Sequence, residues 1–325
     1  MLTPPDLQPQ QLIAALEKAY AIAATQIAFL PLGADADSAA FRADDWFVKL
    51  RRGPHGAVGA QVAHALFAQG ITAVVAPIPA RDGRLWTAVD GWRMLVYPFL
   101  DLTPASARPM SDAQWAEFGA TMRRMHDAHI ATDLWEQAPT VNYAASWRRD
   151  LHALLPQIEA CDGDDELALA LRGFIRAERV RCTALVERCE SLAAFMRTQP
   201  PTHTLCHTDL HGYNVLTDEA GRVRLVDWDA PLRAPRERDL MFVGGAQFGT
   251  HTAADERRLF FTGYGPVEVN MTAVEYFRRE RIIEDLVLYA RQILESADSP
   301  AERAAALKYF RVNFEPGGTL DAAAG

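Results

Sequence analysis

The sequence predicts an α+β fold in two lobes, with a small antiparallel-sheet N-lobe that has one main helix and a large, mainly helical C-lobe. Three observations support this prediction. Short apolar segments bounded by turn signals fill roughly the first hundred residues, and long helical patterns dominate from Ser111 onward. One strand-rich island, Leu205–Trp228, interrupts the helical half. The chain has 325 residues, 49% of them apolar and 23% charged, which is typical of a globular enzyme.

The N-lobe begins with an amphipathic helix over Leu7–Tyr20, where apolar residues recur at helical spacing. A second helix is expected over Ala57–Gln69, closed by Gly70, a residue that suits a helix C-terminus. The pair Asp90-Gly91 is typical of a tight hairpin between two strands. The expected strands are Gln26–Gly33, Ala39–Arg42, Trp46–Leu50, Val74–Ala76, Leu85–Val89 and Arg93–Phe99.

The C-lobe begins after a short linker near Pro98, so the expected lobes are residues 1–98 and 99–325. Ser111 with Gln114 three positions later resembles a capping box at the start of a helix. Ligands commonly bind between two such lobes. The expected long helices are Ser111–His129, Tyr143–Ile158, Asp165–Phe195 and Ala273–Glu295.

Composition narrows the classes of function. The net charge is −9, which argues against a nucleic-acid partner and is compatible with a cationic substrate. The four cysteines show no CxxC pairing, so free thiols are expected. The N-terminus lacks the basic and apolar regions of a signal peptide, and no apolar run approaches the roughly 20 residues that span a bilayer. We therefore expect a cytoplasmic protein with no membrane partner.

The strand-rich island contains the residues that indicate chemistry. Asp209 is followed five positions later by Asn214, and then by a hairpin that ends in Asp227. This spacing matches the catalytic loop and the metal-binding aspartate of kinases. His207 is expected to brace the loop by hydrogen bonds, whereas the role of His211 stays open.

These residue types suit phosphoryl transfer, which depends on positioning and on neutralising charge. A carboxylate (Asp227) and an amide oxygen (Asn214) are hard ligands that Mg²⁺ accepts. The carboxylate of Asp209 can orient an acceptor hydroxyl and take its proton. The island therefore predicts transfer of the γ-phosphate of ATP or GTP, with Mg²⁺, to a hydroxyl group.

The same stretches carry a family resemblance. His207–Leu216 and Val223–Asp229 resemble the aminoglycoside phosphotransferase family, whose fold is protein-kinase-like. Val226–Gly245 is similar to one branch of it, the spectinomycin phosphotransferases. Further similarity lies in Trp46–Leu50, Val96–Phe99 and Arg278–Leu294. The resemblance implies a kinase of aminoglycoside or aminocyclitol antibiotics that confers resistance, with a nucleotide-binding lobe at 1–98 and a catalytic, substrate-binding lobe at 99–325.

By position, the resemblance assigns nucleotide contacts to Lys49, Gly33, Tyr97 and Phe99. Lys49 would hold the α- and β-phosphates, although on its own it could be a surface lysine on an edge strand. The loop that begins at Gly33 would lie over the phosphates. Tyr97 and Phe99 belong to the expected hinge, whose backbone can read the adenine edge.

One departure from the kinase pattern concerns the partner of Lys49. Kinases pair this lysine with a glutamate on the small lobe's helix. Here residues 56–69 contain no acid, and Ala57 and Gln61 lie near the expected position. Either Lys49 has another partner, or nucleotide binding is weakened, or the enzyme is degenerate. Asp229 is expected beside the site rather than on the metal.

A cationic aminocyclitol requires acidic groups in the C-lobe. Glu280 and Glu284 share a helix face, and Asp285 is adjacent to it. Each of these acids could instead form a salt bridge with a neighbouring arginine. Trp228 could form a wall of the acceptor pocket or pack in the core. Asp209 would contact the acceptor hydroxyl itself.

Three functions remain open from the sequence. The first is an ATP-dependent phosphotransferase acting on an aminoglycoside or aminocyclitol such as spectinomycin. The second has the same chemistry with another antibiotic, a small metabolite or a protein as acceptor. The third is a nucleotide-binding regulator without turnover, which the missing helix acid suggests.

Overall fold

The computed structural model describes residues 4–32, 37–53, 56–199, 202–248, 251–296 and 298–323. By their internal contacts these residues form two compact units. The first comprises residues up to 140 together with 204–233 and 258–265, and the second comprises 141–203, 234–257 and those from 266 onward. The division of the chain into lobes at 1–98 and 99–325 stays a prediction.

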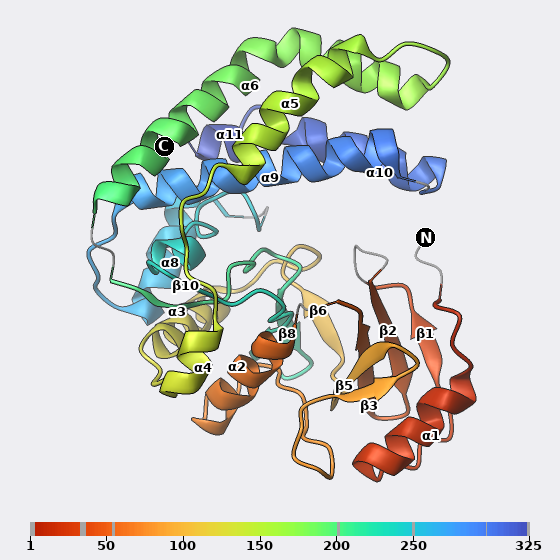
Figure 1. The fold of residues 1–325 in the computed structure, drawn as a ribbon. Coiled ribbons are helices and arrows are strands. Elements are labelled where there is room, and N and C mark those ends of the chain that lie inside the picture. The colour runs from red at the N-terminus through yellow and green to blue at the C-terminus, as the bar shows by residue number, and fades with distance from the viewer. Residues whose placement is uncertain are drawn as a thin grey trace. The chain divides into compact units, whose positions relative to one another are not determined.

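The first unit contains the predicted antiparallel sheet (Figure 1). Its strands follow the order β1-β2-β3-β5-β4, and each neighbouring pair is antiparallel. The elements are α1 (Pro9–Tyr20), β1 (Ala28–Leu30), β2 (Ser38–Ala43), β3 (Trp46–Arg51), α2 (Ala57–Ala68), β4 (Thr87–Val89), β5 (Trp92–Pro98), β6 (Leu102–Pro104), α3 (Asp112–His126), α4 (Thr132–Gln137), β7 (Thr204–Cys206), β8 (Val215–Asp218) and β9 (Val223–Leu225). The α+β fold class with a sheet-built N-terminal part is confirmed.

The register of the sheet places Lys49 on the face that α1 does not cover. Side chains alternate between the two faces of a strand. Val48 and Leu50 are fully buried in a core shared with Leu12 and Leu16 of α1. Lys49 lies between them in β3 and opposes Leu95 of β5, so its side chain leaves from the other face.

The predicted strand Val74–Ala76 is not part of this sheet. Val74 instead forms an isolated parallel bridge with Leu225 of β9. The N–H of Val75 donates to the Leu225 carbonyl at 3.0 Å, and the Leu225 N–H donates to Ala73 at 2.8 Å. The segment that follows α2 therefore pairs with β9 of the β8–β9 hairpin instead of adding a strand to the five-stranded sheet.

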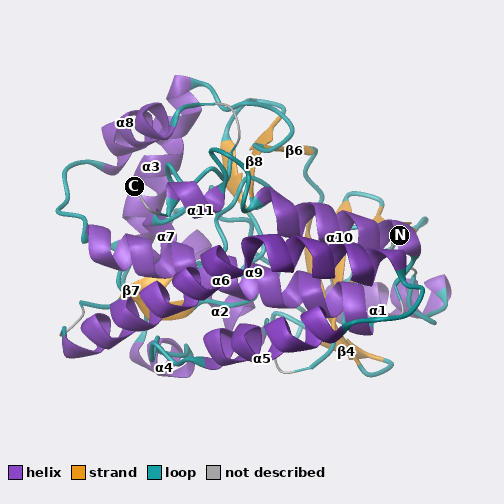
Figure 2. Cartoon of the chain, turned by 90° about the horizontal axis from the view of Figure 1, so that it is seen from above, coloured by secondary structure: helices purple, strands orange, loops and turns teal. Residues whose placement is uncertain are grey.

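The second unit is helical (Figure 2), as predicted for the later part of the chain. Helices α5, α6, α9 and α10 pack against one another. Its helices are α5 (Ser146–Ala160), α6 (Glu166–Thr198), α7 (Glu237–Leu240), α9 (Met271–Glu295), α10 (Pro300–Val312) and α11 (Thr319–Ala322). Two elements, β10 (Leu232–Ala234) and α8 (Ala253–Tyr264), run from one unit into the other.

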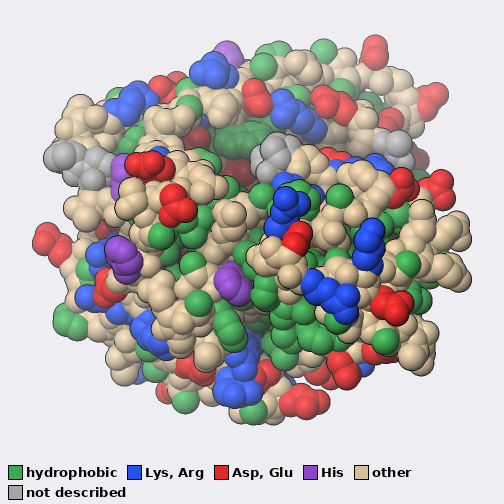
Figure 3. All heavy atoms as spheres, turned by 60° about the horizontal axis from the view of Figure 1, so that its bottom comes forward, with side chains coloured by type: hydrophobic (Ala, Val, Ile, Leu, Met, Phe, Trp, Pro, Cys, Tyr) green, Lys and Arg blue, Asp and Glu red, His purple; other side chains and the backbone are tan. Residues whose placement is uncertain are grey.

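The local structure agrees with two expectations. The capping box is confirmed, since the side chain of Ser111 accepts from the Gln114 N–H at 3.3 Å and the Gln114 side chain accepts from the Ser111 N–H at 2.8 Å. The four cysteines are free, as expected. In the described part of the chain, no helix is both long enough and apolar enough to span a membrane. Acidic and basic side chains are intermixed over the face that Figure 3 shows.

Candidate active site

The β8–β9 hairpin brings two candidate metal ligands to its open end. Val215 pairs with Leu225 in register, and the Val226 N–H donates to the Asn214 carbonyl at 3.1 Å. Asn214 and Asp227 are therefore adjacent, one before the first strand and one after the second. Hairpin pairing thus joins two residues that are thirteen positions apart in the sequence.

Hydrogen bonds hold the candidate catalytic loop, which carries Asp209, against the segment that carries Asp227. The Asp209 N–H donates to Nδ1 of His207 at 3.3 Å, so the ring proton sits on Nε2, which donates to the Val226 carbonyl at 2.9 Å. The Thr208 hydroxyl donates to the Ala230 carbonyl at 2.9 Å. His207 is 1% exposed, which fits the bracing role predicted for it.

Two residues of the site have left-handed backbone conformations that side chains disfavour. Thr208 has a φ of 78° and Asp227 a φ of 65°. Such strain costs about 1–3 kcal/mol per residue and persists only where the surrounding structure enforces it. Here the Thr208 hydroxyl and the backbone pairing of the hairpin provide that enforcement.

Asn214 fixes the orientation of Asp209. The Asn214 Nδ2 donates to the backbone carbonyl of Asp209 at 2.9 Å and to its Oδ2 at 2.9 Å. A carboxylate only accepts hydrogen bonds, so the nitrogen end of the amide must face it. The oxygen end of Asn214 consequently faces another direction.

His211, whose role the sequence left open, lies beside Asp209. Its Nδ1 accepts the Tyr213 N–H at 3.2 Å, which puts the ring proton on Nε2. That Nε2 is 3.4 Å from Asp209 Oδ2. Asn214 and His211 therefore both approach the same oxygen of the candidate base.

Lys49 contacts two carboxylates that come from one short segment. Its Nζ lies 2.8 Å from Asp227 Oδ1 and 2.8 Å from Asp229 Oδ1. Burial lowers the pKa of the Lys49 ammonium, but the two carboxylates outweigh it and the pKa is raised. Burial raises the pKa of Asp227, but Lys49 outweighs it and the pKa is lowered. Both groups are thus held in their charged forms.

Trp228 packs inward rather than lining an open pocket. It is 5% exposed, and its ring centroid lies 4.4 Å from that of His207. Its backbone carbonyl abuts α2, where a Cβ on Gly59 would lie 1.5 Å from the Trp228 oxygen. Only glycine allows this close approach. Trp228 as an acceptor contact stays a prediction.

The predicted nucleotide contacts in the hinge are placed as follows. Tyr97 opposes Phe47 across β5 and β3, on the same sheet face as Lys49. The Phe99 N–H donates to the Asp45 carbonyl at 2.8 Å, so a nucleobase would meet the Phe99 carbonyl or a neighbouring backbone group instead. Gly33 lies outside the described residues.

The residues at the hairpin end fit a magnesium ion. Mg²⁺ prefers oxygen ligands and binds to proteins through one or two carboxylates, keeping other positions for water and phosphate. Asp227 offers a charged carboxylate, and Asn214 offers the amide oxygen that Asp209 does not use. The donor set is therefore suitable.

Three acidic candidates for acceptor binding, Glu280, Glu284 and Asp285, lie in α9 of the second unit, whereas Asp209 lies in the first. Glu280 forms an ion pair with Arg148, which is 2% exposed, and Cys189 donates to the same carboxylate at 3.1 Å. Asp285 pairs with Arg281 at 3.0 Å, and Glu284 is half-buried. The sequence suggested arginines on α9 itself as alternative partners. For Glu280 the partner is Arg148 of α5, which no local spacing indicates.

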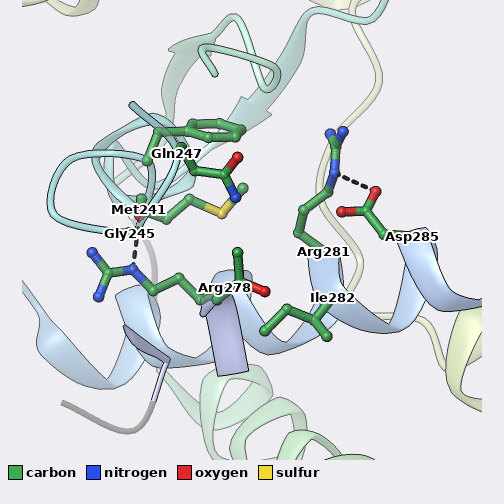
Figure 4. Close-up of a pocket in the computed structure, with 9 residues that line it drawn as sticks. Met241, Gly245, Gln247, Arg278, Arg281, Ile282 and Asp285 are labelled. Atoms are coloured by element: carbon green, nitrogen blue, oxygen red, sulfur yellow. Dashed lines mark hydrogen bonds and ion pairs between the residues drawn. The ribbon is translucent and has the colours of Figure 1, made fainter. Parts of the chain in front are cut away.

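A small cavity lies next to Asp285 (Figure 4). Its lining includes Arg278, whose guanidinium donates to the Met241 carbonyl at 2.7 Å, and Gln247. Its volume is about 10 Å³, which is room for one water molecule. Within the second unit, this cavity is too small for a sugar-sized ligand.

Fold and site together define a phosphotransferase with the architecture of the protein kinases. A lysine of the third strand, an Asp-x4-Asn loop and an aspartate after the following hairpin occur in the order found in that class and lie together. The chain belongs to the phosphotransferase enzyme family, whose model matches residues 27–277. It is accordingly an enzyme that transfers phosphate to an alcohol group.

Individual relatives narrow the comparison. The chain is similar to spectinomycin phosphotransferase APH(9)-Ia solved with ADP and spectinomycin, with 28% identity, a TM-score of 0.89 and 98% of each chain covered. The AMP-bound form of that enzyme gives a TM-score of 0.86 at 28% identity, covering 98% of this chain and 99% of that one. Protein StrN of Streptomyces griseus is 28% identical over 222 residues, which cover 65% of this chain and 67% of StrN.

Proposed function

We propose that the protein phosphorylates a hydroxyl group of an aminocyclitol antibiotic, with spectinomycin as the first acceptor to test, using ATP and Mg²⁺. The observation that carries the chemistry is the convergence of Asp209, Asn214, Asp227 and Lys49 on one hairpin. Support for the acceptor comes from the likeness to a spectinomycin phosphotransferase over 98% of both chains. Phosphorylation of such a drug by this protein would make the host cell resistant to it.

Each residue of the site has a distinct part in the proposed reaction. Asp209 accepts the proton of the acceptor hydroxyl as the oxygen attacks the γ-phosphorus, and the bond from that phosphorus to the bridging oxygen breaks so that ADP leaves. Asn214 holds Asp209 in place by donating one hydrogen bond to its backbone carbonyl and one to its carboxylate. Lys49 neutralises charge on the nucleotide phosphates. Asp227 and the Asn214 oxygen would hold Mg²⁺, which supplies charge neutralisation at the phosphates.

The charged side chains of the candidate active site suit a nucleotide that binds together with a metal cation. Lys49 and Arg51 are two cations, and Asp209, Asp227 and Asp229 are three carboxylates. The site thus has one carboxylate more than it has cations before nucleotide and metal enter, which favours binding of a metal cation together with the nucleotide. The net charge of −9 over the whole chain favours the approach of a cationic acceptor.

The test uses the purified full-length protein with ATP, Mg²⁺ and spectinomycin. We expect ADP release and a product that is heavier than spectinomycin by one phosphate. Asp209→Asn should lower kcat by about 10²–10⁴-fold, the usual contribution of a general base, while ADP binding stays unchanged. Asp218→Asn is the control, because Asp218 pairs with Arg224 at 2.9 Å in the hairpin and is given no part in the chemistry.

The outcomes separate the alternatives. Full activity of Asp209→Asn would remove Asp209 from the mechanism. Transfer to another hydroxyl compound but not to spectinomycin would assign a different acceptor to the same chemistry. Binding of ATP and Mg²⁺ without transfer to any member of a broad acceptor panel would indicate a regulatory protein.

A further inference from the structure

The active-site lysine lacks the helix acid that kinases provide. In kinases a glutamate on the small lobe's helix holds the lysine in position to contact the phosphates. Residues 56–69, which include α2, contain no Asp or Glu. We propose that Asp229 takes this part and is the positioning residue of Lys49. The proposal rests on the proposed function's use of a nucleotide.

The hydrogen bonds that the Lys49 ammonium donates support this assignment. An ammonium group has three N–H donors. One contacts Asp227 Oδ1 and one contacts Asp229 Oδ1, each at 2.8 Å. Within the described residues these are the two hydrogen-bond partners of its ammonium, so the third donor is left for a phosphate oxygen. Two fixed contacts restrict the rotation of the long side chain, so Asp229 reduces the entropy that Lys49 loses when it binds phosphate.

The two carboxylates are held differently, which separates their roles. Asp229 has a cation on each oxygen, since Oδ1 contacts Lys49 and Oδ2 lies 3.3 Å from Arg51 Nε. A carboxylate occupied in this way is suited to hold side chains in place rather than to bind a metal. Asp227 contacts Lys49 through Oδ1 only, which leaves it the better metal ligand of the two.

The packing of α2 explains why the acid lies on the hairpin side. Gly59 lets α2 approach the Trp228 backbone so closely that any side chain there would overlap its carbonyl oxygen, at 1.5 Å. Asp229 follows Trp228 directly, and its Oδ1 would be 3.5 Å from a Cβ on Gly56 at the start of α2. The hairpin thus delivers a carboxylate to the place beside α2 where the helix itself has none.

This arrangement couples the lysine to the metal site. Asp229 lies two residues after Asp227, so the lysine anchor and the candidate metal ligand belong to one short segment. Thr208 secures that segment through its bond to the Ala230 carbonyl. Correct placement of Lys49 therefore follows from folding of the hairpin and needs no acidic side chain from α2.

The experiment compares neutral variants of Asp229 with the Asp218→Asn control. Asp229→Asn and Asp229→Ser are both made, so that a folded neutral variant is available, and folding is checked by circular dichroism. Calorimetry measures the Kd of ADP with Mg²⁺, and steady-state kinetics separate kcat, the KM of each substrate and the Mg²⁺ dependence. Loss of one charge-assisted contact should weaken nucleotide binding roughly 10- to 100-fold.

The expected pattern is specific to positioning of the lysine. The KM for ATP should rise by that factor, and the KM for the acceptor and the Mg²⁺ requirement should stay within about twofold of wild type. Asp229→Glu should recover part of the affinity because it keeps the charge. Asp218→Asn should bind nucleotide like the wild type.

Three results would overturn the inference. Wild-type nucleotide affinity in a folded neutral variant would show that Asp229 does not anchor Lys49. A defect that excess Mg²⁺ or Mn²⁺ repairs would make Asp229 a metal ligand instead. If the wild-type protein itself bound no nucleotide, the proposed function would be overturned together with the inference. The Kd of the wild-type protein alone separates this outcome from a failure of the inference about Asp229.

Discussion

Replacing Gly59 by alanine tests the close contact on which the site is built. An ideal Cβ at this position lies 1.5 Å from the Trp228 oxygen and 2.7 Å from its carbonyl carbon. Real Cβ atoms do not come nearer than 3.0 Å to such atoms, so α2 or the Trp228 segment must move by about 1.5 Å. Asp229 follows Trp228 directly and would move with it.

Two opposing contributions set the change in the free energy of unfolding of Gly59→Ala. Alanine is about 1 kcal/mol better than glycine inside a helix, which would stabilise the variant. Overpacking against backbone costs about 1–3 kcal/mol and outweighs that gain, because a carbonyl group cannot rotate away as a side chain can. The Lys49–Asp229 contact of 2.8 Å would also lengthen beyond hydrogen-bonding distance. We expect lower stability and weaker nucleotide binding together.

Thermal denaturation and calorimetric titration with ADP and Mg²⁺ measure both effects. Gly173→Ala is the matched control, since Gly173 lies inside α6 and a Cβ there would meet nothing within 4 Å. That control should be stabilised by about 0.5–1 kcal/mol and should bind ADP normally. If Gly59→Ala behaved like Gly173→Ala in both measurements, the contact of α2 with the Trp228 backbone would not position Asp229.

Two further predictions concern buried acids of the second unit. Burial raises the pKa of Glu256 from 4.5 to about 7, so the native state binds more protons than the unfolded state between these values, and stability falls by up to about 3 kcal/mol as the pH rises from 4.5 to 7. Glu256→Gln should flatten this part of the stability profile in denaturant titrations at several pH values, and an unchanged slope would contradict it. Breaking a buried ion pair by removing one partner costs about 3–5 kcal/mol. Glu280→Gln should destabilise the protein by about 3 kcal/mol, the lower end of that range, because Arg148 still has Glu190 as an ion-pair partner at 2.6 Å. A raised acceptor KM at unchanged stability would instead assign Glu280 to acceptor binding.

The partner of Lys49 bears on the hypothesis of an inactive regulator. That hypothesis depended on the absence of an acid in residues 56–69. Lys49 nevertheless contacts two carboxylates, so the absence of a helix acid does not leave it without a counter-charge. The sequence contained one indication that Asp229 contacts Lys49. A buried lysine requires a counter-charge, and Asp229 is close in sequence to Asp227 of the candidate site.

Some features of this protein could be predicted from the sequence because they depend on neighbouring residues. The capping box at Ser111 and the hairpin after Asn214 follow from local spacing and turn chemistry. The Asp209–Asn214 pair is likewise local, since five residues of one loop bring them together. Predictions of this kind need only backbone propensities and hydrogen-bond partners close in the chain.

Other features depend on segments distant in sequence and were decided by the tertiary structure. Val74 pairs with Leu225 of β9 instead of joining the five-stranded sheet, because tertiary packing decides which strand lies beside the segment that follows α2. Glu280 meets Arg148 across 132 positions, and Lys49 meets Asp229 across 180. The sequence by itself determined the residue types and spacing of the candidate site, namely Asp209, Asn214, Asp227 and a lysine. Only the fold decided which acid holds that lysine, because the choice depends on how closely α2 can approach the hairpin backbone.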